Sequence, residues 1–169
     1  KVPVSVELTT ETETEMLAEA REYAKWQPKH VVIKVPMTEL GLRVINVLER
    51  HDKTPVNVTC IMSFNQAYLA ALAGATYVSI FSGRVRDMGY DPAPVIEQTR
   101  AVLERERLKA QIIVGSIRHL ADVNEALRAG AHIVTVPPAI LKKMCLNPRT
   151  TETIREFNDA WHKDRSKRK

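Results

Sequence analysis

A single lysine stands inside an otherwise apolar run of the sequence. The run Val31-Val32-Ile33-Lys34-Val35-Pro36 is rich in β-branched residues and has the length of a buried strand. Loss of solvation in a protein interior favours a neutral amine, which is the nucleophile that attacks a carbonyl to form an imine. The other interpretation is a lysine whose stem packs along the sheet while its charge reaches water or a carboxylate. This run alone supports both interpretations equally.

Polar residues also lie near the ends of other apolar runs. Taken singly, Thr59, Ser79 and Ser116 are most simply ordinary strand or packing residues, and Asn57 is as well explained by a loop. Glu7 is harder to explain as an edge charge. Their joint placement with a lysine in an apolar strand predicts a polar site.

Two arginines follow consecutive apolar runs, Arg84 in Phe81-Ser82-Gly83-Arg84 and Arg118 in Gly115-Ser116-Ile117-Arg118. A single arginine is most often solvated or paired with an acid such as Asp87. Two guanidiniums above a buried lysine suit a phosphate group, which they bind with a bidentate geometry that lysine cannot match.

These side chains need a framework of alternating strands and helices. Short apolar runs predict strands at 2–8, 30–36, 55–61, 76–82, 111–117 and 132–136. Amphipathic stretches predict helices near 11–25, 38–50, 64–73, 92–109, 121–129, 139–145 and 151–162. Strands that alternate with helices favour a parallel sheet, either a closed barrel or an open doubly wound sheet. In a barrel, functional residues gather at the carboxyl ends of the strands.

The length of 169 residues predicts one domain over 1–169, ending in a charged tail at 163–169. Much of the net charge of +5 lies in that tail without interleaved aromatic residues, which argues against a nucleic-acid partner. No apolar run is long enough to cross a bilayer, so no membrane partner is expected. Cys60 and Cys145 lack the spacing of a metal site and favour a reducing, cytoplasmic setting. No nucleotide-binding glycine motif follows the first strand.

Taken in order, several stretches resemble the transaldolase family from about residue 4 to residue 162. They are Ser5-Val6-Glu7-Leu8, Ile33-Lys34-Val35-Pro36-Met37-Thr38, Asn57-Val58-Thr59, Ser79-Ile80-Phe81-Ser82-Gly83-Arg84 and Gly115-Ser116-Ile117-Arg118. The resemblance implies a TIM (β/α)8-barrel type of α/β fold and a class I aldol mechanism. In that mechanism Lys34 forms an imine with a sugar phosphate, without a cofactor or a metal ion.

The resemblance also assigns roles. Lys34 would be the nucleophile, while Glu7 and Thr59 would hold the water that transfers protons. The implied substrate-binding residues are Asn57 and Ser79 for hydroxyl groups, Phe81 for the pocket wall, and Arg84, Ser116 and Arg118 for the phosphate.

Two activities occur among proteins that this sequence resembles. Transaldolases pass a dihydroxyacetone unit to an aldose phosphate in the pentose phosphate pathway, whereas fructose-6-phosphate aldolases release it free. The aldolase branch carries Gln, Ala and Tyr where this sequence has Glu7, Ser79 and Phe81. We therefore expect a transaldolase, with aldolase as the alternative.

One departure from the family concerns the amino-terminal end. The family's barrel begins with two further strands, which carry an Asp and a Thr-Asn-Pro stretch, and this sequence opens at the third. Six β/α units are thus expected, with two unpaired sheet edges, as in a truncated or processed form of a longer protein. A non-catalytic remnant that acts as an interaction module is a further alternative. By analogy with small members of the family, we expect a homo-oligomer.

Overall fold

The computed structural model describes residues 2–167, and the chain divides after Val136 into two compact units. The first unit contains six strands and the helices α1 to α6. The second contains α7 (Pro138–Met144) and α8 (Pro148–Lys167). A single domain over 1–169 stays a prediction.

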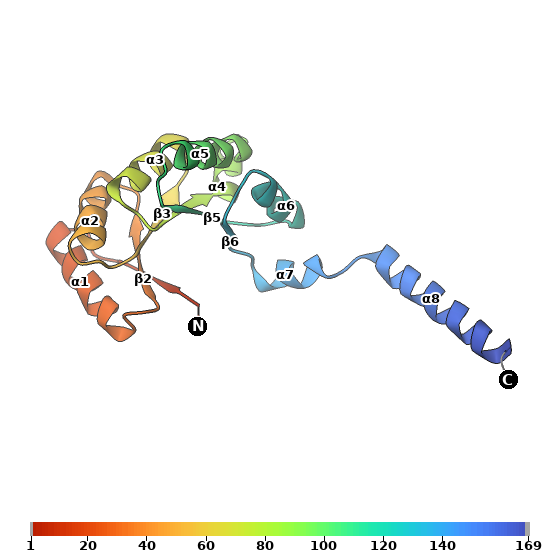
Figure 1. Ribbon diagram of the computed structural model, residues 1–169. Helices are drawn as coiled ribbons and strands as arrows, with labels where there is room; N and C mark the ends of the chain where they lie inside the picture. Colours follow the sequence, from red (N-terminus) through yellow and green to blue (C-terminus); the bar gives the residue numbers. More distant parts are fainter. Residues whose placement is uncertain (1, 168–169) are drawn as a thin grey trace. The chain divides into compact units, whose positions relative to one another are not determined.

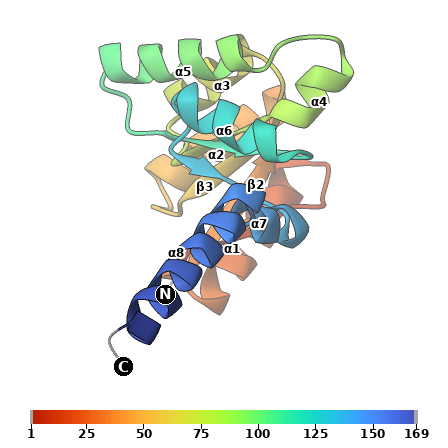
Figure 2. The same cartoon turned by 90° about the vertical axis from the view of Figure 1, so that its right-hand side faces the viewer.

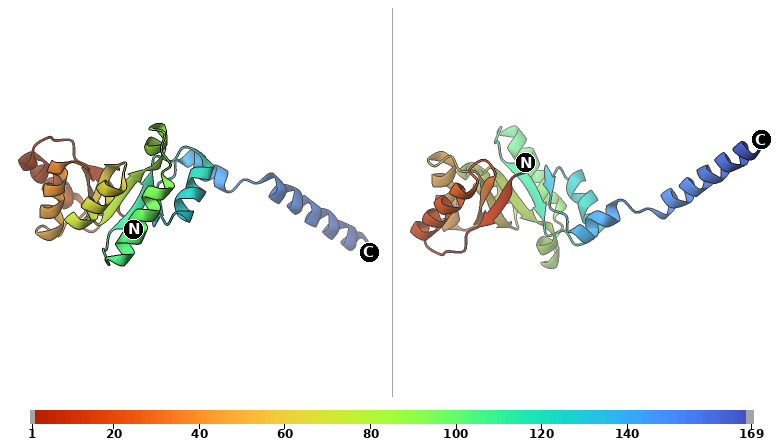
Figure 3. Two further views of the ribbon diagram at one scale, coloured as in Figure 1. Left: turned by 90° about the horizontal axis from the view of Figure 1, so that it is seen from above. Right: turned by 90° about the horizontal axis from the view of Figure 1, so that it is seen from below.

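The six strands form one parallel sheet in the order β1-β2-β3-β4-β5-β6. The sheet curves into a half-barrel, as Figures 1 and 3 show. Within the described residues, β1 pairs only with β2 and β6 only with β5. The α/β fold with six β/α units is therefore confirmed. The strands are β1 (Val4–Glu7), β2 (Val31–Pro36), β3 (Val56–Ile61), β4 (Tyr77–Phe81), β5 (Gln111–Gly115) and β6 (Ile133–Val134).

Helices connect successive strands and cover the outer face of the sheet. Figures 1 and 2 show α3 and α5 side by side on that face. Local signals fix the helix ends: Thr12, Thr38 and Ser63 each accept a backbone N–H as N-caps, and Gly74 closes α3 with a left-handed φ of 107°. The helices of this unit are α1 (Glu13–Trp26), α2 (Glu39–Arg50), α3 (Phe64–Ala73), α4 (Ser82–Asp87), α5 (Ala93–Arg105) and α6 (Leu120–Arg128).

The apolar core lies between the sheet and the helices. Side chains alternate across each strand, and those that face the helices are fully buried, including Ile33, Val35, Val58, Val78, Ile80, Ile112 and Val114. Burying each such side chain stabilises the fold by about 1.5–3 kcal/mol. The intervening residues, such as Lys34, Asn57 and Ser79, face the inside of the half-barrel. The alternation that builds the core therefore also presents polar groups on the inner face.

Several element boundaries differ from those expected. The strand expected at 132–136 contains only Ile133–Val134, and the helix expected at 92–109 ends at Arg105 because Arg107 takes a left-handed φ of 55°. The short helix α4 directly after β4 was not predicted.

The last helix is longer at both ends than the predicted 151–162. It begins at Pro148, where the side chain of Asn147 accepts the backbone N–H of Arg149 at 2.9 Å. It continues to Lys167, since no Gly or Pro follows to end it. Within the charged tail expected at 163–169, residues 163–167 are therefore helical, and residues 168 and 169 lie outside the described residues.

Candidate active site

A cavity of about 370 Å³ opens on the inner face of the sheet. Five residues predicted from the sequence line it: Lys34, Asn57, Ser79, Phe81 and Ser116. They converge because parallel strands bring their carboxyl ends to the same side of the sheet. The other lining residues are Ser5, Ile113, Gly115, Ile133 and Thr135.

Lys34 and Glu7 form an ion pair beside this cavity. They are direct neighbours in the register of β1 and β2, and Lys34 Nζ donates to Glu7 Oε2 at 2.8 Å. The side chains are 26% and 47% exposed, respectively. The amine thus reaches a carboxylate and lines the cavity as well, and the carboxylate is close enough to exchange a proton with it.

A second hydrogen-bonded row crosses the inner face from β1 to β4. The Nδ2 of Asn57 donates to Ser5 Oγ at 3.1 Å, and Ser79 Oγ donates to Asn57 Oδ1 at 2.7 Å. Asn57 and Ser79 are both buried. The row fixes the orientation of the amide in the wall of the cavity.

Thr59, a predicted catalytic residue, does not line the cavity. It is fully buried, and its hydroxyl donates a long hydrogen bond of 3.9 Å to the sulfur of Cys60. At that point β3 contains a bulge, because its register with β4 shifts between Val58 and Ile61 and Cys60 has a φ of 62°. Such a bulge redirects the side chains around it.

The two predicted phosphate-binding arginines lie outside the lining of the cavity. Arg84, in α4, has its guanidinium 6.0 Å from the centre of the Phe81 ring. Arg118 donates through both terminal nitrogens to the carboxylate of Asp87. Hydrogen bonding from Arg118 lowers the pKa of Asp87.

Gly83 joins the two arginine segments. A Cβ at this position would lie 2.2 Å from the carbonyl oxygen of Ser116 and 2.8 Å from its hydroxyl oxygen. Ser116 itself has a left-handed φ of 60°, and Ser82 Oγ donates to the carbonyl of Gly115 at 3.1 Å. The start of α4 therefore packs directly on the end of β5, and only glycine permits this approach.

We expect Gly83→Ala to lower the free energy of unfolding by about 1–3 kcal/mol, because the new methyl group must displace backbone atoms. Urea unfolding of the variant and the wild type measures this difference. Gly115→Ala is the matched control, since its Cβ would meet the Phe81 ring at an ordinary 3.6 Å. Equal destabilisation by the two substitutions would contradict the packing described for Gly83.

Glu19 ties the loop after β1 to α1. Its carboxylate accepts hydrogen bonds from the backbone N–H groups of Thr9 at 3.0 Å and Thr10 at 3.3 Å, and from the Tyr23 hydroxyl at 2.7 Å. Burial acts to raise the pKa of Glu19, but the hydrogen bonds from Tyr23, Thr9 and Thr10 outweigh it and lower this pKa to about 2. The loop next to Glu7 is therefore held by an ionised carboxylate.

A depressed carboxyl pKa predicts that Glu19 stabilises the fold above pH 4.5 and that this contribution is lost as the pH falls towards 2. The free energy of unfolding at pH 6 minus that at pH 3 should be smaller in Glu19→Gln than in the wild type. Glu22→Gln, an exposed change on the same helix, serves as the control. An identical difference in Glu19→Gln and the wild type would rule out this role.

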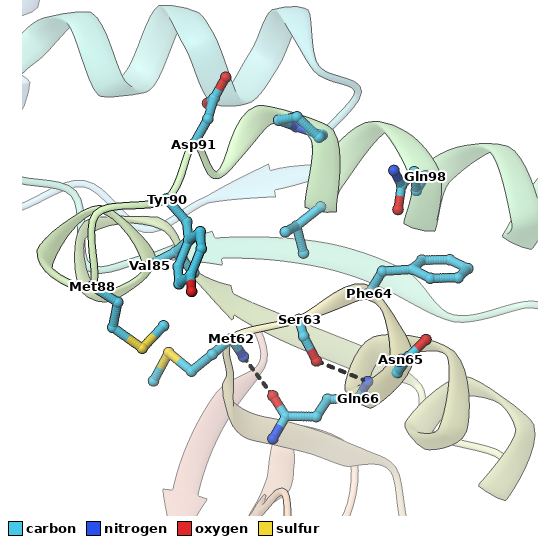
Figure 4. A pocket seen from close by; sticks show the side chains of 12 residues that line it. Met62, Ser63, Phe64, Asn65, Gln66, Val85, Met88, Tyr90, Asp91 and Gln98 are labelled. Atoms are coloured by element: carbon cyan, nitrogen blue, oxygen red, sulfur yellow. Dashed lines mark hydrogen bonds between the residues drawn. The ribbon is translucent and has the colours of Figure 1, made fainter.

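A second, larger cavity of about 800 Å³ lies beside α4 and the amino-terminal end of α5. Figure 4 shows Met62, Met88 and Tyr90 on one side of it and Phe64 and Gln98 on another. Gln66 holds the adjoining loop by accepting the backbone N–H of Met62 at 2.8 Å. Its twelve lining residues include no Lys, Arg or His. The smaller cavity is the candidate active site because Lys34 lines it and its amine is paired with the carboxylate of Glu7.

Two further searches concern the part of the chain that the structure describes. Over residues 2–167, no three or more His, Cys, Asp or Glu side chains are grouped so that they could hold a metal ion. In the same residues, every helix is too short or too polar to span a membrane.

Sequence reasoning missed Ser5 and Thr135 as lining residues. Ser5 precedes Glu7 by two residues, so the alternation of β1 could have placed both on the inner face. Thr135 follows directly after β6 and had no comparable signal.

Comparisons of the sequence with known proteins agree on one family. The family model described as transaldolase/fructose-6-phosphate aldolase matches residues 1–168. A probable transaldolase from Streptococcus equi subsp. zooepidemicus is 42% identical over 159 residues, which cover 94% of this chain and 73% of the relative. A probable transaldolase 2 from Listeria monocytogenes is 43% identical, covering 94% of this chain and 72% of the relative.

A solved structure, GMP reductase from Trypanosoma brucei, superposes with a TM-score of 0.59. The match covers 78% of this chain and 31% of the reductase at 17% sequence identity. At that identity the similarity concerns the fold alone.

Proposed function

The chain belongs to the transaldolase/fructose-6-phosphate aldolase family, and from this premise we propose that it is a transaldolase acting through an imine on Lys34. The observation that carries the proposal is the 2.8 Å contact between Lys34 Nζ and Glu7 Oε2 beside a cavity with polar walls. A carbonyl compound in that cavity would meet a nucleophile and a proton acceptor together.

The reaction begins with proton transfer from the Lys34 ammonium to the Glu7 carboxylate, which leaves a neutral amine. The amine adds to the ketone carbon of a ketose phosphate, and Glu7 returns its proton to the carbinolamine hydroxyl, which leaves as water and gives an iminium ion. The Glu7 carboxylate then accepts the proton of the hydroxyl on the carbon beyond the scissile bond, the carbon–carbon bond breaks, and its electron pair moves into the iminium. An aldose phosphate leaves, and a three-carbon enamine stays on Lys34.

The second half of the reaction runs in the opposite direction to the first. The enamine carbon attacks the aldehyde of an acceptor aldose phosphate, and hydrolysis of the new iminium frees the product and restores the amine. Asn57 and Ser79 are proposed to bind hydroxyl groups of the three-carbon unit, because their hydrogen-bonded row lies in the cavity wall. We assign proton transfer to Glu7, since Thr59 is buried away from the cavity.

The phosphate group is proposed to bind at Arg84, Ser116 and Arg118. The packing of Gly83 on Ser116 supports this site because it joins the segments that carry the two arginines. Phe81 lines the cavity and its ring centre lies 6.0 Å from the Arg84 guanidinium, so Phe81 is proposed as the wall of the cavity on that side.

We place the reaction in the cytoplasm, as a step of the pentose phosphate pathway. The family supports this placement, and Cys60 and Cys145 are both free thiols, as in a reducing setting.

The test supplies fructose 6-phosphate with and without an aldose phosphate acceptor such as erythrose 4-phosphate, and measures release of glyceraldehyde 3-phosphate. Transaldolase activity predicts sustained release only with the acceptor. Release at the same rate without an acceptor, together with free dihydroxyacetone, would identify a fructose-6-phosphate aldolase instead. The Glu7, Ser79 and Phe81 side chains favour the transferase.

A non-catalytic interaction module is the second candidate, and the open sheet edges favour it. In the described residues β1 and β6 each lack a partner on one side, and such edges can accept strands from another chain. Partner binding that survives replacement of Lys34, in a protein without either activity, would support this candidate.

A homo-oligomer is also proposed. In α8, Ile154, Phe157 and Trp161 recur at helical spacing and are 54%, 70% and 63% exposed. Exposed aromatic residues on one helix face are typical of an interface. Light scattering after size exclusion would show a mass above that of one chain.

A further inference from the structure

The side chain of Arg118 is held by α4. Its two terminal nitrogens, Nη1 and Nη2, donate to the two carboxylate oxygens of Asp87 at the end of that helix. The side chains are 48% and 52% exposed, so a simple surface ion pair would contribute little.

The backbone of Arg118 is held separately, by α6. Asp122 is buried, and its Oδ2 accepts the backbone N–H groups of Arg118 at 2.9 Å and His119 at 2.8 Å. Arg86 then joins α4 to α6 by donating to Glu125 Oε2 at 2.5 Å. Arg118 is thus fixed at both ends by groups that belong to two different helices.

The pair with Asp87 determines which edge of the guanidinium stays accessible. Asp87 occupies the edge formed by the two terminal nitrogens, which leaves the edge that contains Nε. That nitrogen lies 3.0 Å from the point where Gly83 would carry a Cβ, and Ser116 Oγ lies 2.8 Å from the same point. Two hydrogen-bond donors therefore converge above a residue without a side chain.

We propose that Asp87 is a positioning residue for the phosphate end of the substrate. By holding the outer edge of Arg118, it turns the Nε edge towards Ser116, where a phosphate oxygen can bind both donors. This inference rests on the proposed function, because it refines the phosphate site given there. By its charge alone, a carboxylate near the site would weaken phosphate binding. The positioning role predicts the opposite, that Asp87 strengthens phosphate binding.

The test uses Asp87→Asn, which keeps the shape and removes the charge. Asp52→Asn is the matched control, because Asp52 forms a similar two-point pair with Arg21 elsewhere on the molecule. Titration calorimetry with inorganic phosphate should give a dissociation constant about tenfold higher for Asp87→Asn, since the freed side chain must be ordered on binding. Asp52→Asn should match the wild type, and Asp87→Glu should recover part of the loss.

Catalytic readouts separate positioning from a general structural effect. In Asp87→Asn, KM for fructose 6-phosphate should rise while kcat stays unchanged. Borohydride trapping of unphosphorylated dihydroxyacetone on Lys34 should also be unchanged. Phosphate binding by Asp87→Asn that is unchanged or tighter than in the wild type would overturn the inference, as would a wild type that does not bind phosphate.

The outcome also distinguishes this inference from the proposed function. A wild type that binds phosphate with the expected dependence on Asp87, but traps no ketone on Lys34, would support the positioning role and contradict the transaldolase. Trapping of a ketone on Lys34, with no effect of Asp87→Asn on phosphate binding, would support the transaldolase and contradict the positioning role of Asp87.

Discussion

The activity with fructose 6-phosphate should fall more than about 10³-fold in Lys34→Met, because a thioether cannot form an imine. The loss should appear in kcat, whereas the phosphate site stays in place. Release of glyceraldehyde 3-phosphate in the presence of an acceptor measures it. The fold should be retained, because Glu7 is 47% exposed and water can solvate the charge that is left.

Lys29→Met is the matched control for this variant. Lys29 is an exposed lysine that precedes the same strand, so its replacement removes an equal charge without touching the cavity. Its activity should equal that of the wild type. Substantial activity in a folded Lys34→Met protein would mean that another group is the nucleophile.

Replacing Glu7 has the second largest expected effect. Glu7→Ala should lower kcat by about 10²–10³-fold, because the carboxylate that accepts the proton of Lys34 is removed. The imine should still form, although more slowly, so borohydride should trap an adduct in this variant as well. Steady-state kinetics together with the trapping rate separate the two effects.

Glu7→Gln is the variant to compare with Glu7→Ala. The amide keeps the hydrogen-bonding shape, and Gln is the residue that the aldolase branch carries here, so the loss should be smaller than with Ala. Equal activity of Glu7→Ala and the wild type would exclude Glu7 from proton transfer.

Much of this fold could be predicted from the sequence, because its periodicities are clear. Six apolar runs became six parallel strands. The N-cap Thr38 begins α2 and Gly74 ends α3, where local chemistry favours a helix boundary. The exceptions have local causes. The short helix α4 follows β4 without a break, so its residues looked like a loop. After His162, Lys163, Arg165 and Lys167 are good helix formers, and α8 continues through them.

The candidate site was predictable to a similar extent. Alternation along the strands and the shared carboxyl edge of a parallel sheet brought Lys34, Asn57 and Ser79 together. The displacement of Thr59 was not predictable, because the bulge at Cys60 depends on pairing between strands. Pairing of an arginine with Asp87 was foreseen as the alternative to phosphate binding, but the two-point contact with Arg118 was not, since it depends on the unforeseen helix α4.

The central claim is that Lys34 forms an imine with a ketose phosphate. The protein is mixed with fructose 6-phosphate, reduced with borohydride, digested, and its peptides are examined by mass spectrometry. The account predicts one reduced three-carbon adduct, on the peptide that contains Lys34, and none in Lys34→Met. An adduct on a different lysine, or no adduct from folded protein, would contradict it.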